Sequence, residues 1–346
     1  MIIPIALLTH LFLQKNIDLS LMSTPFIPDS GATRLTRLAL IKVSGADAIS
    51  FLQGQLTNDI KALTETGVCL AGYCTPKGRL LATMLIWRDN DTLMLQVPLE
   101  LQEVLQKRLQ MFVLRAKVRL EHVSEHHTML GFIGSSAAAL TAPWFPSLPS
   151  SPYESVTNQS GTLLRVADAC GVARYQWIVP KESGEQVWQT LSGTVPILNG
   201  QDWELSEIHA GIPHISIATQ EKFVPQMINY ELIGGVNFKK GCYPGQEIVA
   251  RTHYLGKQKR RMVLAQVESN TVAAGTEVFA ADDLTQPCGM VVNAAANHAG
   301  GSDCLIEIKT ASYRQSTVQL QDGAVCHWLE MPYPLPDDAP SDQPIH

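Results

Sequence analysis

The segment from Arg261 to the C-terminus limits the possible folds more than any other part of the chain, because it holds only short apolar runs. Turn-rich stretches such as 297–301 and 321–323 separate these runs, and none of them has the period of a helix. Six short strands are predicted, at 262–267, 277–280, 289–293, 304–309, 317–321 and 325–329. Six short strands without a helix are typical of a small β-barrel, which we expect over residues 256–335.

Strands and helices alternate in the residues before this segment, which indicates an α+β architecture. A strand is predicted at 36–44, and Ile49, Leu52 and Leu56 follow it at helical spacing. A hairpin is expected at 72–87, with its turn at 76–78. A helix at 99–113 should bury one apolar face, formed by Leu101, Leu105, Leu109 and Phe112. The remaining predicted elements are strands at 93–97, 163–167 and 174–179, and a helix at 183–191.

The length of the chain, 346 residues, is too great for one ordinary core and predicts two or three packed domains. A stretch rich in proline and serine at 141–155 marks a junction. We therefore expect a first α+β part at 22–140, a second at 141–255 that carries the cysteine loop described below, and the barrel at 256–335. The tail at 336–346 is rich in proline and is expected to be disordered.

Residues 1–13 are mostly apolar and could be taken for the core of a signal peptide. They lack a basic region before the apolar run, and no small-residue cleavage site clearly follows. The run is also shorter than the roughly 20 residues that span a bilayer. An ordinary protein start follows at Met22. We interpret residues 1–21 as a non-native or disordered extension, with a weak membrane anchor as the alternative. The expected location is cytoplasmic, without a membrane partner.

The seven cysteines are odd in number and scattered, and no CxxC pair occurs. This pattern disfavours a secreted disulfide framework and a tetrahedral structural zinc site. Reduced thiols in a cytosol fit it best, and we assign no metal ligands.

The loop from Lys240 to Glu247, with the sequence Lys-Gly-Cys-Tyr-Pro-Gly-Gln-Glu, is the candidate working site. Two of its glycines flank the thiol and permit a positive φ or a close backbone approach. Residues 243–246 are typical of a type II turn, with proline second and glycine third. A short helix or strand is expected at 246–252. The loop-forming residues are Gly241, Tyr243, Pro244, Gly245 and Gln246.

The chemistry expected of this loop is that of a thiolate. Cations near a thiol lower its pKa, and Lys240 and Arg251 lie close in sequence to Cys242. Glu247 is a carboxylate that can orient a cation or accept a proton. Residues 239–261 hold seven lysines or arginines and one acidic residue, although the whole chain has a net charge of −6. Such a basic island suits an anionic partner. The alternative is a buried structural cysteine beside a solvated basic face.

The loop resembles the signature of the YgfZ-type folate-binding proteins, which belong to the superfamily of the glycine-cleavage T protein, an aminomethyltransferase. The resemblance extends from about residue 34 to residue 335. The other matching segments are 51–59, 76–79, 211–213, 223–226, 234–236, 250–251, 256–257, 259–260 and 332–333.

This resemblance implies a cloverleaf-like fold with tetrahydrofolate or another reduced folate in its central hollow. It also implies a role in assembling or maintaining iron–sulfur enzymes, including those that thiolate tRNA. The implied partners are folate and these client enzymes, with tRNA as an indirect one. Folate contacts are expected from Lys77 and Arg79, which suit a carboxylate, and from Asn58 and Asp59. The alternatives are an exposed turn for the first pair and helix-end hydrogen bonding for the second.

Two rival functions remain. The first is a folate-dependent aminomethyl or methyl transferase, or a demethylase. The aspartates of the T protein have no counterpart at 77–82, and its Gly-Tyr-Thr-Gly-Glu segment has none near 172–176, so ordinary aminomethyl transfer would lack its proton-handling groups. The second rival is a tRNA-binding module that uses the basic residues 257–261. Its binding would depend strongly on salt, but the acidic net charge disfavours it as a primary role.

Overall fold

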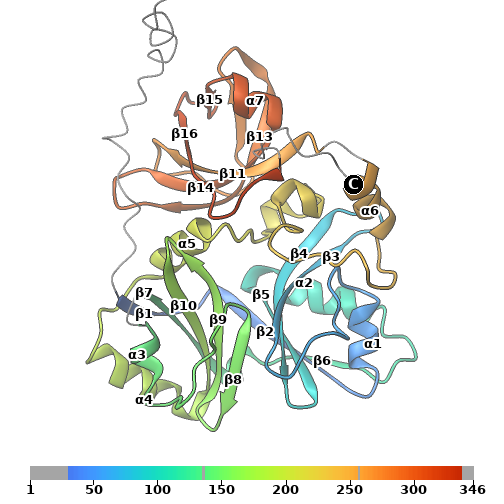
Figure 1. Ribbon diagram of the computed structural model, residues 1–346, viewed down its shortest axis with the longest axis vertical. Coiled ribbons are helices and arrows are strands. Elements are labelled where there is room, and N and C mark those ends of the chain that lie inside the picture. The colour runs from blue at the N-terminus through green and yellow to red at the C-terminus, as the bar shows by residue number, and fades with distance from the viewer. Residues whose placement is uncertain (1–29, 135–136, 256–257, 337–346) are drawn as a thin grey trace, which may run out of the picture.

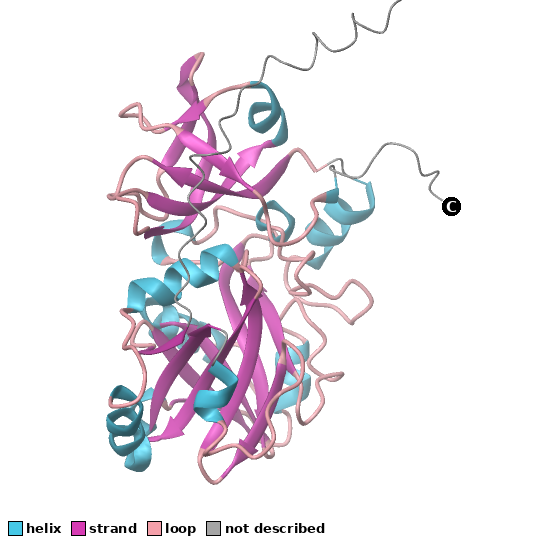
Figure 2. Cartoon of the chain, turned by 60° about the vertical axis from the view of Figure 1, so that its left-hand side comes forward, coloured by secondary structure: helices cyan, strands magenta, loops and turns pink. Residues whose placement is uncertain are grey.

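The computed structural model describes residues 30–134, 137–255 and 258–336 and contains three β-sheets (Figure 1). Two sheets of five strands lie side by side, and a third sheet of six strands lies above them in this view. Figure 2 shows from another side that the strands of the two lower sheets run beneath the third sheet. The expected extension at 1–21, residues 337–346 of the expected tail, and Gly256 and Lys257 lie outside the described residues.

The first sheet has the strand order β3-β4-β5-β2-β6 and is antiparallel throughout. Its strands are β2 (Leu38–Ser44), β3 (Val68–Cys74), β4 (Leu80–Asp89), β5 (Thr92–Pro98) and β6 (Arg119–His122). The predicted strand at 36–44, the hairpin at 72–87 and the strand at 93–97 are confirmed. The predicted helix after residue 45 is α1 (Ala48–Gln53), which ends before Leu56.

The predicted helix at 99–113 is α2 (Leu99–Gln110), and it is shorter than expected. Leu101, Leu105 and Leu109 are buried as predicted. Phe112 is 46% exposed, so its placement on the buried face was wrong. The reason is that α2 ends before Phe112, and the apolar period of the sequence continues past the end of the helix.

The second sheet has the order β1-β7-β10-β9-β8. Its strands are β1 (Ser30–Arg34), β7 (His127–Gly134), β8 (Glu154–Asn158), β9 (Gly161–Ala169) and β10 (Val172–Pro180). β1 and β7 precede residue 141, yet β7 pairs with β10. The second sheet therefore draws strands from both sides of the expected junction. Two helices flank it, α3 (Ala137–Thr141) and α4 (Lys181–Ser192), and α4 confirms the helix predicted at 183–191.

The third sheet confirms the barrel-like unit, with the order β15-β12-β13-β14-β11-β16. Its strands are β11 (Arg260–Val267), β12 (Glu277–Ala280), β13 (Asp283–Ala296), β14 (Ser302–Lys309), β15 (Val318–Gln319) and β16 (Cys326–Leu329). A bridge between Gln319 and Val325 brings the two ends of this order together. The expectation of a segment without helix was wrong, because α7 (Thr310–Gln315) lies between β14 and β15.

One apolar core extends from the first sheet into the other two units. It includes Leu52 and Ile86 from the first unit, Ile133 from the second, and Met262 and Leu305 from the third. The three units therefore pack as one body around a shared centre. No helix in the described part of the chain is long and apolar enough to cross a membrane.

Candidate functional site

Helix α5 (Gly200–His209) runs between the second sheet and the barrel-like sheet (Figure 1). It begins with a capping box, in which Asp202 N donates to Asn199 Oδ1 and Asn199 N donates to Asp202 Oδ2, each at 2.9 Å. Its side chains from Asp202 to His209 are buried except for Glu204, because the helix is covered on several sides. We did not predict α5, since a helix that is buried nearly all round has no amphipathic pattern.

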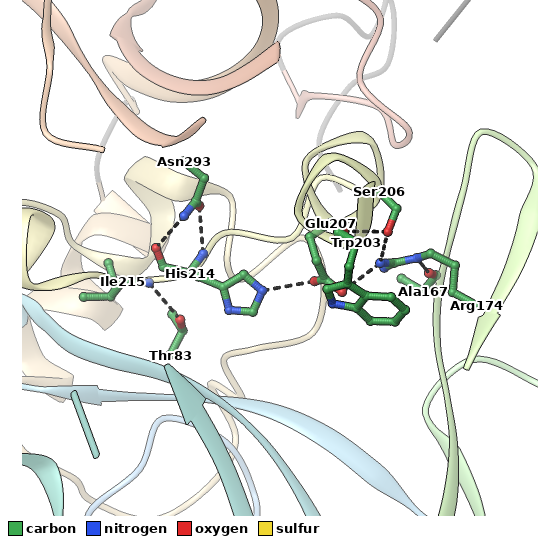
Figure 3. A network of polar contacts seen from close by, with 9 residues as sticks. All are labelled: Thr83, Ala167, Arg174, Trp203, Ser206, Glu207, His214, Ile215 and Asn293. Atoms are coloured by element: carbon green, nitrogen blue, oxygen red, sulfur yellow. Dashed lines mark hydrogen bonds and ion pairs between the residues drawn. The ribbon is translucent and has the colours of Figure 1, made fainter. Parts of the chain in front are cut away.

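A polar network joins α5 to β10 at the centre of the molecule (Figure 3). Arg174 is fully buried, and its Nη1 donates to Glu207 Oε1 at 2.7 Å and to Ser206 Oγ at 2.9 Å. Its Nε donates to the carbonyl oxygen of Ala167 at 2.8 Å, and its guanidinium lies 5.0 Å from the centre of the Trp203 ring. The arginine is thereby fixed on nearly all sides, with its charge compensated by the carboxylate.

The same network continues from Glu207 to the other two units. His214 Nε2 lies 3.0 Å from Glu207 Oε2. His214 N donates to Asn293 Oδ1 of β13 at 2.9 Å, and Ile215 N donates to Thr83 Oγ1 of β4 at 3.1 Å (Figure 3). The network therefore links strands of all three sheets at one point.

The pKa of Glu207 reflects this position. Burial alone would raise the pKa of the carboxyl, but the charge and hydrogen bonds of Arg174 and His214 outweigh it and lower the pKa to about 2. The carboxylate is consequently ionised at neutral pH and is a weak proton acceptor.

Two hollows meet at this network. The inner one has a volume of about 30 Å³, enough for about one water molecule, and lies between the first two sheets and α5. The outer one is a groove of about 770 Å³, a size typical of small-molecule sites. Residues that line both are Leu38, Glu207, Ile212 and His214.

Two buried polar atoms in the inner hollow have no hydrogen-bond partner among the described residues. They are the Nη2 of Arg174 and the Oε1 of Gln176, a donor and an acceptor on the same strand, β10. Buried polar atoms are nearly always paired in folded proteins, so this donor and acceptor are available to a water molecule or to a polar group of a ligand.

The cysteine loop lies elsewhere, on the turn of the β3–β4 hairpin. Gly245 has a φ of +82°, and Gln246 N donates to the carbonyl oxygen of Tyr243 at 3.2 Å, which confirms the predicted type II turn. Of the two options for the residues that follow, the helix is the right one: α6 spans Gln246–Leu255. A Cβ added to Gly245 would lie 2.4 Å from the carbonyl oxygen of Thr75 and 2.6 Å from Gly78 Cα. The structure thus brings the cysteine loop and the predicted hairpin turn into backbone contact.

Lys240 is buried beneath the loop and does not project to the surface. Its Nζ donates to the carbonyl oxygens of Gln53 and of Leu56, the latter at 2.6 Å, and it lies 5.1 Å from the centre of the Tyr243 ring. Burial lowers the pKa of Lys240 to about 8, against the opposing charges of Asp59 and Cys242. The lysine therefore holds the loop against the end of α1, while Cys242 itself is exposed.

The remaining predicted site residues are distributed around this loop. Glu247 and Arg251 are exposed on α6 and form no ion pair with any described residue. Asn58 donates to the carbonyl oxygens of Leu70 and Gly234, and Asp59 Oδ1 accepts from Ala62 N, so both make local structural hydrogen bonds. Lys77 is exposed at the hairpin turn, and Arg79 donates to the carbonyl oxygen of Lys222. None of the predicted site residues lines the groove or the inner hollow.

Sequence reasoning missed Arg174, Glu207 and His214. The first lies in the 172–176 stretch that we compared with a catalytic segment, but its partners Ser206 and Glu207 are more than 30 residues away along the chain. Only the Asn-x-x-Asp capping pattern at 199–202 gave a local signal, and it predicts a helix start without indicating a site.

A second buried ion pair joins α5 to the barrel-like sheet. His209 Nε2 lies 2.6 Å from Asp303 Oδ2, and both side chains are buried. Burial alone would lower the pKa of His209, but hydrogen bonds to Asp303 and to the Cys170 sulfur raise it to about 9. Asp303 is fixed in turn by Asn297, whose Nδ2 donates to Asp303 Oδ1 at 2.7 Å.

The ion pair between His209 and Asp303 should make the protein less stable as the pH rises above 6.5. Because the pKa of His209 is raised in the folded state, its stabilising effect is complete below the unfolded value of 6.5 and disappears as pH rises through about 9. Between pH 6.5 and 8 we expect the free energy of unfolding to fall by about 2 kcal/mol. The lowered pKa of Lys240, about 8, adds stability only above that window. Urea denaturation across the window tests this. His209→Gln should remove most of the decline, and an equal decline in both proteins would refute it.

No family model matches the chain. The known proteins and solved structures that are similar to it include the following three. The tRNA-modifying protein YgfZ of Shigella boydii serotype 4 is 32% identical over 241 residues, which are 69% of this chain and 73% of that protein. The aminomethyltransferase T of the glycine cleavage system of Bartonella henselae superposes with a TM-score of 0.71 at 15% identity, over 88% of this chain and 86% of that one. A heterotetrameric sarcosine oxidase from a Corynebacterium species gives a TM-score of 0.36 at 12% identity, over 50% of this chain and 90% of that one. The superposition on aminomethyltransferase T confirms the aminomethyltransferase-like fold expected from the sequence.

Proposed function

The chain belongs to the family of the tRNA-modifying protein YgfZ, and from this premise we propose that it is a tetrahydrofolate-binding accessory protein for iron–sulfur enzymes. Its role is the assembly or repair of such enzymes in the cytoplasm, including those that thiolate tRNA. The observation that supports folate binding is the pair of unpaired buried atoms, Arg174 Nη2 and Gln176 Oε1, beside a groove of ligand size.

The groove suits a reduced folate in size, and two polar atoms of the adjoining inner hollow suit its ring. A pterin ring carries donors and acceptors on one edge, which match a free guanidinium nitrogen and a free amide oxygen. Arg37, at the rim of the groove, keeps 77% of its side chain exposed and pairs with Glu204 at 2.7 Å. This arginine suits the carboxylates of the folate tail. The inner hollow is smaller than a ring and must widen for the pterin to reach both atoms.

The reactive element of the proposal is the exposed thiol of Cys242, as a redox group or a transient ligand for a client. Lys240 holds the loop from below, and Arg251 and Glu247 are exposed on the helix that follows. Lys77 is exposed on the hairpin turn against which the loop packs, and it suits an anionic group brought to the thiol.

The transferase alternative has weaker support at this site. The groove does contain carboxylates, but Glu207 has a pKa of about 2 and is held by Arg174 and His214. Such a group is too weak a base for efficient proton transfer near neutral pH. Formation of methylene-tetrahydrofolate from a methylamine substrate would favour the transferase instead.

Folate binding is tested by calorimetric titration with tetrahydrofolate. Gln176→Met removes the free acceptor without leaving another buried group unpaired, and the dissociation constant should rise about tenfold. The matched control is Gln186→Met, the same change on the exposed side of α4, which should bind like the wild type. Absence of binding to the wild type would remove folate from the proposal.

The thiol half of the proposal needs a separate experiment. In cells that lack the wild-type protein, Cys242→Ala should fail to restore the activity of iron–sulfur enzymes. The same variant should retain folate binding, since Cys242 lines neither hollow. Full restoration by Cys242→Ala would refute a chemical role for the thiol and leave the folate site standing.

A further inference from the structure

An aromatic cluster lies at the last turn of α6, where two rings of the helix meet one ring that precedes the cysteine loop. The rings of Phe238 and His253 are stacked, with centroids 3.8 Å apart and planes 13° apart. Tyr254 lies edge-on to both, at 6.1 Å from Phe238 and 4.8 Å from His253. Tyr254 is 66% exposed, and His253 is also exposed. An ordered aromatic cluster with an exposed tyrosine is a surface on which another flat ring can stack.

The basic residues around this cluster divide into engaged and exposed ones. Lys240 is buried, Arg260 pairs with Glu307, and Arg261 pairs with Glu231. The predicted basic cluster 257–261 therefore offers fewer free charges than its sequence indicates, and Lys257 lies outside the described residues.

Three exposed cations remain, of which two lie between Phe238 and His253 along the chain and one follows Tyr254. Lys239 follows Phe238 directly, Arg251 lies one helical turn before Tyr254, and Lys259 follows the end of α6. None of the three forms an ion pair with a described residue. The surface made of Phe238, Lys239, Arg251, His253, Tyr254 and Lys259, called here the α6 platform, thus combines stacking faces with unpaired positive charge.

We propose that the α6 platform binds single-stranded RNA, with a base stacked on the exposed ring of Tyr254 and phosphates at Lys239, Arg251 and Lys259. Stacking aromatics interleaved with cations are the usual means of binding single strands, because every base has a flat face and every nucleotide a negative charge. An acidic peptide would use the cations but not the stacked rings. Glu247, the one acidic residue of α6, lies two turns before Tyr254, about 10 Å along the helix axis, and so leaves the stacking position free.

This inference rests on the proposed function, in which the protein is connected to tRNA only through its client enzymes. It adds a direct contact between the protein and RNA. Lys239 lies three residues before Cys242, and α6 begins four residues after it. RNA bound on the α6 platform would therefore lie beside the exposed thiol. The folate groove is lined by other elements, so the two ligands have separate sites.

Fluorescence anisotropy with a labelled single-stranded RNA of about ten nucleotides tests this on the full chain. Tyr254→Ala should weaken binding about tenfold, whereas Tyr254→Phe should retain it because the ring remains. Lys239→Gln and Lys259→Gln should each reduce the slope of log affinity against log salt by about 1. The matched control is Lys181→Gln on α4, an exposed lysine of the second sheet unit, which should leave the slope unchanged.

Two outcomes would overturn the inference: no binding to the wild type at low salt, or equal binding by the wild type and Tyr254→Ala. Because Tyr254 is exposed, its replacement should not disturb folding, and circular dichroism of the variant checks this directly. Titration of the wild type with tetrahydrofolate separates the two proposals. Normal folate binding by the wild type together with no RNA binding by the same protein would refute the platform alone and leave the folate site intact.

Discussion

Replacement of Arg174 by methionine should lower the free energy of unfolding by about 3–5 kcal/mol, the largest loss we expect from a single change. The side chain is fully buried and compensates Glu207, which is itself buried and ionised. Methionine fills a similar volume but leaves the buried carboxylate with its contact to His214 and without the charge of Arg174. Removing one partner of a buried ion pair destabilises the fold much more than replacing both partners by apolar residues, because the remaining charge stays buried without compensation. Urea denaturation at neutral pH measures the effect.

The matched control for this prediction is Arg34→Met. Arg34 pairs with a carboxylate through two hydrogen bonds, at 2.7 and 2.8 Å to Glu185, but the side chains are 33% and 60% exposed. Exposed pairs contribute at most about 1 kcal/mol, so this variant should remain close to the wild type. The double variant Arg174→Met/Glu207→Leu should regain part of the lost stability, because neither charge remains. Similar losses for Arg34→Met and Arg174→Met would contradict the account of the central network.

The elements that the sequence predicted well are those with a local signal. The β3–β4 hairpin has a proline–lysine–glycine turn between two apolar runs, and the structure gives Gly78 of this turn a positive φ of +72°. The type II turn at 243–246 was predicted from proline and glycine at their required positions. The short strands of the barrel-like sheet alternate with turn residues, so their number was predictable although α7 between two of them was not.

The central network was not predictable because it depends on contacts between distant residues. Arg174 and Glu207 are 33 residues apart, and Asn293 lies 79 residues after His214. Each residue type is common on protein surfaces, and nothing in its neighbours indicates burial. Only the packing of three sheets around α5 brings these side chains together.

Lys240 shows how a correct motif can mislead about a role. The sequence places it two residues before the thiol, where a cation would favour the thiolate. The structure instead directs its ammonium group to carbonyl oxygens at the end of α1, a favourable position for a positive charge. Lys240 therefore positions the loop that carries Cys242, in addition to any effect of its charge on the thiol. A variant at Lys240 would change both the position of the loop and the charge near the thiol, so it would not separate the two effects.

A second large effect is expected at the contact between the loop and the hairpin. Gly245→Ala should lower the free energy of unfolding by about 2–4 kcal/mol, for two reasons that add. The φ of +82° is unfavourable for alanine, and its Cβ would lie 2.4 Å from the carbonyl oxygen of Thr75. The atoms nearest to this Cβ belong to the backbone of Thr75 and Gly78, and backbone atoms cannot move aside as a flexible side chain can. The loop should therefore separate from the hairpin turn.

Gly241→Ala is the matched control, since it lies on the other side of Cys242 and a Cβ there would meet nothing within 4 Å. It should change the free energy of unfolding by less than about 0.5 kcal/mol. Hydrogen exchange of the hairpin turn and of α6 adds a local measurement, and faster exchange is expected in both segments for Gly245→Ala only. Equal stability and exchange for the two variants would mean that the loop does not depend on the hairpin for its position. In that case the hydrogen bonds of Lys240 to the end of α1 would be enough to hold the loop in place. The exposed position of Cys242 would then not depend on the hairpin turn.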